Sequence, residues 1–159
     1  MNRFTLAATS LAAAVAAGTG SFASADSVSG WYARLRKPPY QPPSAAFPVA
    51  WTTLYGDIAV TSAVAIDRFR EAGQPDKARR YAAALGFNLV LNAAWSWLFF
   101  RFHKLGASAV GAAALTVSSA DLARRAAQAD PRAGLALSAY PLWCSFATVL
   151  ATHVWRLNR

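Results

Sequence analysis

The sequence predicts an all-α integral membrane protein, a single domain built as a bundle of five transmembrane helices. Hydrophobic residues make up 55% of the 159 residues and charged residues only 14%, whereas soluble domains contain about 25% charged residues. A helix needs about 20 apolar residues to cross a hydrocarbon core. Five runs of this kind occur, and we expect spans at about 4–25, 45–66, 81–100, 105–122 and 133–155.

The first run, 4–25, has two interpretations. An early basic residue, an Ala-rich stretch and the ending Ala23-Ser24-Ala25 before Asp26 also describe a cleaved signal peptide. Composition alone does not separate a removed leader from a retained first helix. The resemblance described below favours a retained helix.

The connector at 26–44 is rich in proline, with Pro38, Pro39, Pro42 and Pro43. Proline fixes the backbone and also restricts the preceding residue, so this segment should be stiff. We expect it to lie over a pocket at the mouth of the bundle. Its aromatic residues fit an interfacial belt equally well; they are Trp31, Tyr32 and Tyr40.

The second span contains a polar and aromatic stripe. Residues four, three and four apart fall on one helix face, and here they are Trp51, Tyr55, Ile58 and Ser62. Asp57 points about 120° away from this stripe. A carboxylate within a membrane is costly and is a candidate functional residue. It can also be protonated, or belong to a polar stripe with Thr53 and Thr61.

The third span places two carboxamides and several aromatic rings on one face. The residues at this spacing are Tyr81, Leu85, Asn88, Asn92, Trp95 and Phe99. Asparagines in hydrocarbon need hydrogen-bond partners, and interhelical bonds are their common use. Alternatively, Asn88 and Asn92 present polar groups to a mostly apolar ligand on which Trp95 stacks. The pattern leaves both uses open.

The fourth and fifth spans have different characters. The fourth has a ridge of small residues, which suggests close packing within the chain or in a homodimer; the ridge is Ala107, Gly111, Ala114 and Ser118. The fifth repeats the aromatic stripe with Ala136, Tyr140, Trp143, Ala147 and Leu150. Pro141 removes a backbone donor and should kink this helix.

The remaining side chains argue against several classes of function. The net charge of +9 comes from residues in the connectors, where Lys and Arg flank membrane helices, so we expect no nucleic-acid partner. A single cysteine, Cys144, excludes disulfides and cysteine metal sites within one chain. His103 and His153 belong to no catalytic or metal-binding motif, and we predict no catalytic or metal-ligating residue.

Four segments, read in order, resemble the tryptophan-rich sensory protein family, also called the translocator protein or peripheral benzodiazepine receptor family. They are WYARLRKPPYQPP at 31–43, FPVAWTTLY at 47–55, LNAAWSWLFF at 91–100, and the closing LW, AT and WRLN within 142–158. They cover nearly the whole chain beyond the first span. The motifs KPxxxPP, FPxxW and NxxW, in this order, form a specific pattern.

The resemblance implies a five-helix bundle, frequently dimeric, that binds protoporphyrin IX or haem in a pocket beneath the first connector. Matching positions imply a site containing Trp31, Phe47, Trp51, Asn92, Trp95, Trp143, Ala147 and Leu150, to which the stripes add Tyr55 and Asn88. Acidic groups of a tetrapyrrole would find Arg34, Arg36 and Lys37 nearby. No cofactor is required, because the tetrapyrrole is the ligand.

We therefore expect a multi-pass receptor or sensor of bacterial type, surrounded by lipid, that takes part in porphyrin transport or regulation. Two alternatives stay open: an enzyme that degrades porphyrin with light or oxygen, using Trp31 or Trp51, and a small-molecule transporter that uses Asp57. The chain departs from the family at Tyr40 and Ala45, where tryptophan is usual, and in the order Tyr140-Pro141. Thr152 replaces the tyrosine of the C-terminal sterol pattern, which argues against sterol binding.

Overall fold

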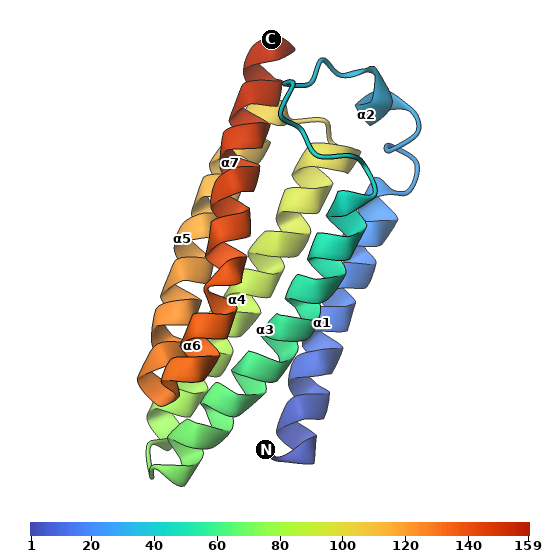
Figure 1. Cartoon of the computed structure of the whole chain (residues 1–159). Coiled ribbons are helices and arrows are strands. Elements are labelled where there is room, and N and C mark those ends of the chain that lie inside the picture. The colour runs from blue at the N-terminus through green and yellow to red at the C-terminus, as the bar shows by residue number, and fades with distance from the viewer.

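The computed structural model describes all residues, 1–159, and is entirely helical apart from its connecting segments (Figure 1). Five helical spans are long and apolar enough to cross a membrane, which confirms the predicted fold class. They are α1 (Arg3–Ser24), α3 (Ala46–Glu71), α4 (Pro75–Ser96) with the π-helix η1 (Trp97–Arg101), α5 (Leu105–Ala129), and α6 (Pro131–Leu137) with α7 (Ala139–Leu157). The short helix α2 (Trp31–Arg34) lies in the first connector, above one end of the bundle.

Several helices are longer than the apolar runs that predict them. α3 continues to Glu71 and α4 begins at Pro75, so most of the charged segment 68–80 is helical rather than a loop. Long charged side chains can extend a helix beyond the hydrocarbon because their heads reach water. Proline is well suited to the first turn of α4, where no intrahelical N–H bond is lost.

The fifth span is divided at Ser138, between α6 and α7. In a continuous helix the N–H of residue 141 would bond to the Leu137 carbonyl, but Pro141 has no N–H to donate. The predicted disturbance therefore occurs about one turn before the proline itself. The chain reverses at Asp130, α6 packs on the far end of α5, and α7 continues along α5 toward the connector.

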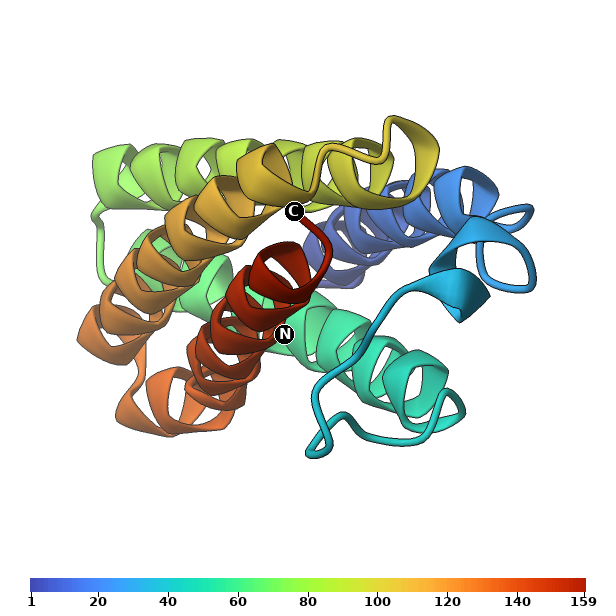
Figure 2. The same cartoon turned by 90° about the horizontal axis from the view of Figure 1, so that it is seen from above.

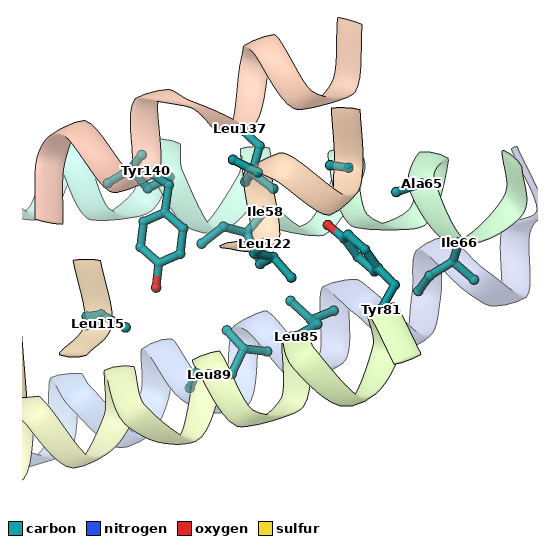
Figure 3. Close-up of a cluster of buried hydrophobic side chains, with 14 of the residues drawn as sticks. Ile58, Ala65, Ile66, Tyr81, Leu85, Leu89, Leu115, Leu122, Leu137 and Tyr140 are labelled. Carbon is teal, nitrogen blue, oxygen red and sulfur yellow. The ribbon is translucent and has the colours of Figure 1, made fainter. Parts of the chain in front are cut away.

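The hydrophobic core fills the half of the bundle away from the connector (Figure 3). Leu122 and Leu137 are fully buried, and Ile58 reaches the same cluster from α3. The cluster also includes Ala65, Ile66, Tyr81, Leu85, Leu89, Leu115 and Tyr140. The three remaining spans, which are α1, α4 and α6 with α7, therefore contact α3 or α5 through side chains of this cluster.

Helices α1 and α3 are joined at this same end. Thr9 donates a hydrogen bond of 2.8 Å from Oγ1 to the Ala59 carbonyl, and Thr5 donates one of 2.8 Å from Oγ1 to Asp67 Oδ1. Seen down the bundle, α1 and α3 then diverge toward the connector end (Figure 2). There α1 packs instead against α4, with Gly20 beside Ser96.

Candidate functional site

A cavity of about 260 Å³ lies at the connector end of the bundle. Residues of α1, α3, α4, η1, α7 and the connector form its wall, and 14 of the 22 lining residues are hydrophobic. Three indoles from three different spans contribute to it: Trp51 of α3, Trp95 of α4 and Trp143 of α7. The three helical stripes of the sequence therefore converge on one space.

Eight of the ten predicted site residues line this cavity. They are Phe47, Trp51, Tyr55, Asn92, Trp95, Trp143, Ala147 and Leu150. The rings hold one another at defined angles, since Phe47 meets Trp143 edge-on at 5.9 Å and Trp51 meets Tyr140 edge-on at 6.4 Å. Aromatic pairs favour such arrangements. The wall is thus a set of fixed rings around an open space.

Trp31, by contrast, does not line the cavity. α2 places its indole on His103, stacked at 3.9 Å between ring centroids, with the edge of Phe99 at 5.7 Å. Its neighbour Tyr32 lines the cavity in its place. Burial raises the pKa of Tyr32, and the hydrogen bond of 2.9 Å that Gln41 Nε2 donates to its hydroxyl works in the opposite direction.

The two carboxamides form one hydrogen-bond chain that crosses four spans. Tyr55 donates to Asn92 Oδ1 at 2.8 Å, and Asn92 Nδ2 donates to the Tyr140 hydroxyl at 2.9 Å. Tyr140 in turn donates to Asn88 Oδ1 at 2.9 Å, and Asn88 Nδ2 donates to Ser118 Oγ at 3.1 Å. Asn88 lies outside the cavity, and both amides join helices, as interhelical polar groups commonly do.

Two lining residues carry a buried polar atom without a hydrogen-bond partner: Trp143 at Nε1 and Gln41 at Oε1. Trp95, in contrast, donates from Nε1 to the Ser108 carbonyl at 3.0 Å. Buried donors and acceptors are normally paired. A donor on α7 and an acceptor on the connector are therefore left unpaired at this site, whereas Tyr55, Asn92 and Trp95 form hydrogen bonds with the protein.

The connector is fastened over the end of the bundle at several points. Asn158, at the end of α7, accepts from the Arg36 N–H at 2.9 Å and donates to the Arg36 carbonyl at 2.8 Å. The Tyr40 hydroxyl lies 3.1 Å from His153 Nδ1. Ser27 donates from its hydroxyl to the Phe100 carbonyl. These bonds hold the connector to α7 and η1 above the cavity.

Sequence reasoning missed the part of the wall that α1 provides. Ala17, Gly20, Ser21 and Ser24 line the cavity there. Successive members of this set are three, one and three residues apart, which places them on one helix face. Small residues give no aromatic or amide signal, and only their spacing could have indicated a wall. Phe100 was also missed, because the π-helix η1 changes the register that the α-helical stripe assumes.

Charge is distributed unequally between the two ends of the bundle. All six ion pairs lie at the end away from the connector. The connector end has no ion pair, although seven basic residues gather there: Arg34, Arg36, Lys37, Arg101, Lys104, Arg156 and Arg159. The cavity therefore lies beneath a basic surface that has no carboxylate partners.

Asp57 is not part of the cavity. Its Oδ2 is buried without a hydrogen-bond partner.

The residues of the small-residue ridge of α5 have different surroundings. Gly111 faces Trp95, and Ser118 accepts a hydrogen bond from Asn88, whereas Ala107 and Ala114 are exposed. Homodimerisation through this ridge stays a prediction.

Comparison with known proteins links this geometry to one family. A family profile described as "TspO/MBR family" matches residues 8–156. The chain is 34% identical over 158 residues to the tryptophan-rich protein TspO of Archaeoglobus fulgidus, covering 99% of each chain. It is 31% identical to the tryptophan-rich sensory protein of Cereibacter sphaeroides and 34% identical to the translocator protein of Homo sapiens, covering 80% of this chain and 77% and 75% of theirs.

Proposed function

This membrane protein belongs to the TspO/MBR family, and we propose that it binds a tetrapyrrole in the cavity beneath the connector. The observation that carries the proposal is the convergence of Trp51, Trp95 and Trp143 from three spans on one mainly apolar space. Indole rings offer large flat faces to a planar π-system. Ligand sites in proteins typically combine such apolar walls with a few polar groups.

The size and charge of the site suggest how a tetrapyrrole would lie. Ligand cavities typically measure about 300–1,000 Å³, so this one, at about 260 Å³, is too small to enclose a whole macrocycle. One edge of the ring would enter among the indoles. The opposite edge, with its carboxylates, would remain near the mouth, where the basic residues of the connector end lack acidic partners.

Metal-free protoporphyrin IX fits the lining residues better than haem does. No lining residue is His, Cys or Met, the side chains that most often ligate haem iron. Two tyrosines line the cavity, but the hydroxyl of Tyr55 donates to Asn92 and that of Tyr32 accepts from Gln41. Binding would therefore depend on stacking and burial rather than on a bond to iron.

Titration of the purified protein with protoporphyrin IX, followed by the porphyrin absorption band, tests this proposal. Trp143→Ala removes one face of the site and should weaken binding about tenfold, since an aromatic contact contributes roughly 1.5 kcal/mol. Trp155→Ala is the matched control, because Trp155 lies on the same helix but does not line the cavity. Equal affinities for the two variants, or no saturable binding by the unchanged protein, would contradict the proposal.

A further inference from the structure

The exposed part of the cavity wall lies at one side, beside the connector. Of the 22 lining residues, four are exposed, and these four are Ser21, Val28, Ser44 and Pro48. Ser21 lies in the last turn of α1 and Val28 shortly after it, whereas Ser44 ends the connector and Pro48 lies in the first turn of α3. The exposed part of the wall is therefore a window between the connector-end turns of α1 and α3.

The course of the two helices explains this window. α1 and α3 are bonded to each other only at the opposite end, through Thr5, Thr9 and Asn2. Toward the connector they separate, and α2 lies above the gap (Figures 1 and 2). No hydrogen bond or ring contact joins residues 17–24 to residues 46–55 there. Small side chains on α1 keep this side of the cavity unfilled.

Large apolar side chains beside the window are exposed, as the lipid-facing surface of a membrane helix requires. Phe22, next to Ser21, is 74% exposed, and Val49, next to Pro48, is 68% exposed. Both lie within apolar membrane-spanning helices, where exposed large side chains contact acyl chains. The aqueous side differs, since the connector is bonded there to Asn158, His153 and Phe100.

We infer that the window between α1 and α3 is a lateral portal through which a flat apolar molecule dissolved in the bilayer enters the cavity. This inference rests on the proposed function, because it concerns the route to the same site. The ligand reaches the indoles from the acyl-chain region without crossing the fastened connector. Its acidic groups can remain at the level of the basic residues while its apolar edge passes between the two helices.

A bulky residue at the window should slow both the entry and the release of the ligand. Ser21→Trp places an indole at the edge of the portal. Ser10→Trp is the matched control, since Ser10 is exposed on the same helix eleven residues earlier, about three turns along the same face. Ser44→Trp, on the other edge, serves as a second blocking variant if Ser21→Trp does not fold.

The measurement mixes proteoliposomes with vesicles loaded with protoporphyrin IX and follows the porphyrin absorption band. We expect Ser21→Trp to slow both association and dissociation, the association by about tenfold, while Ser10→Trp leaves both rates unchanged. Slower dissociation distinguishes a blocked route from a weakened site, because a weakened site would release the ligand faster. Rates that match those of the unchanged protein in both blocking variants would overturn the portal.

A second probe separates failure of the portal from failure of the proposed function. Pyrene is flat and apolar and has no carboxylates, and its entry from the bilayer is followed by energy transfer from the cavity indoles. Slower pyrene entry in Ser21→Trp than in Ser10→Trp supports the portal independently of porphyrin. Pyrene entry through the window combined with no saturable protoporphyrin binding would overturn the proposed function alone.

Discussion

The two halves of this bundle differ in how their interiors are packed and in how their surface charges are paired. Away from the connector, aliphatic side chains interdigitate around Leu122, α6 packs closely on α5, and five arginines form ion pairs with carboxylates. At the connector end the interior is hollow and lined by rings, and the basic residues have no acidic partners. The comparison separates the region that holds the bundle together from the region in which we propose that a ligand binds.

The physical basis of this difference is the shape of the side chains. Branched aliphatic groups adapt to one another and fill space at high density. Indoles and phenyl rings held edge-on leave room between their faces, as the contacts of Trp143 with Phe47 and of Trp51 with Tyr140 show. Substitutions in the two halves should therefore separate loss of folding from loss of binding.

The largest effect is expected at Gly134, in the closely packed half. A Cβ atom there would lie 2.4 Å from the Ala127 Cβ and 2.6 Å from its backbone nitrogen, so α6 must move away from α5. Gly134→Ala should lower the free energy of unfolding by about 3 kcal/mol, at the upper end of overpacking effects. Unfolding in SDS mixed micelles measures this loss, and protoporphyrin affinity of the folded fraction should stay unchanged.

Gly86→Ala is the control for this substitution. Gly86 lies within α4, and a Cβ added there meets no atom within 4 Å. Replacing a helical glycine by alanine without a clash should stabilise the helix by about 0.5–1 kcal/mol. If both variants were equally stable, the close approach of α6 to α5 would have no energetic consequence.

A smaller effect is expected at Tyr140, which lies where the two halves meet. Tyr140→Phe removes the hydroxyl that accepts from Asn92 and donates to Asn88. Interhelical hydrogen bonds of this kind contribute roughly 0.6–1.7 kcal/mol each in membranes, so unfolding should become easier by about 1–2 kcal/mol. Protoporphyrin affinity should remain within about twofold, because both amides act in joining helices.

Tyr81→Phe provides the comparison, since the Tyr81 hydroxyl has one side-chain partner, Ser62 at 3.1 Å, and lies in the core half. Its loss of stability should be about half that of Tyr140→Phe. A strong change in protoporphyrin affinity confined to Tyr140→Phe would instead show that Asn92 presents its amide to the ligand. That result would decide between the two uses of asparagine that the sequence leaves open.

The sequence was sufficient to predict the five spans and eight of the 22 residues that line the cavity, because helical spacing places residues such as Trp51 and Tyr55 on one face. It could not predict the position of Trp31. The sequence predicted a stiff connector but not the short helix α2 within it, and successive helical residues point about 100° apart. Tyr32 therefore faces the cavity while Trp31 faces His103.

The wall formed by α1 was unpredictable for another reason. Gly20 and Ser21 have no side chain that marks a ligand site, and they line the cavity only because α1 diverges from α3 at this end. Helix crossing is determined by packing between elements, which a single-helix pattern does not contain. For the same reason, the sequence assigned the basic residues to connectors but did not show that ion pairs with carboxylates form only at the end away from the cavity.

The smallest effect concerns Asp130, in the paired half, where α6 begins. The pKa of Asp130 is lowered mainly by the hydrogen bonds it accepts from the N–H groups of Arg132 and Ala133, and further by Arg68 at 3.4 Å. Because the folded-state pKa lies below the unfolded value, the charged carboxylate stabilises the fold above pH about 4, and this contribution is lost as pH falls through the folded pKa.

Asp130→Ala should therefore lower the melting temperature slightly at pH 7, and the difference from the unchanged protein should disappear in acid. Asp130→Asn keeps the capping acceptor but not the charge, so its smaller loss should be that of the Arg68 pair alone. A deficit for Asp130→Ala that stayed constant down to pH 3 would mean that the carboxylate does not stabilise this end of the bundle through its charge.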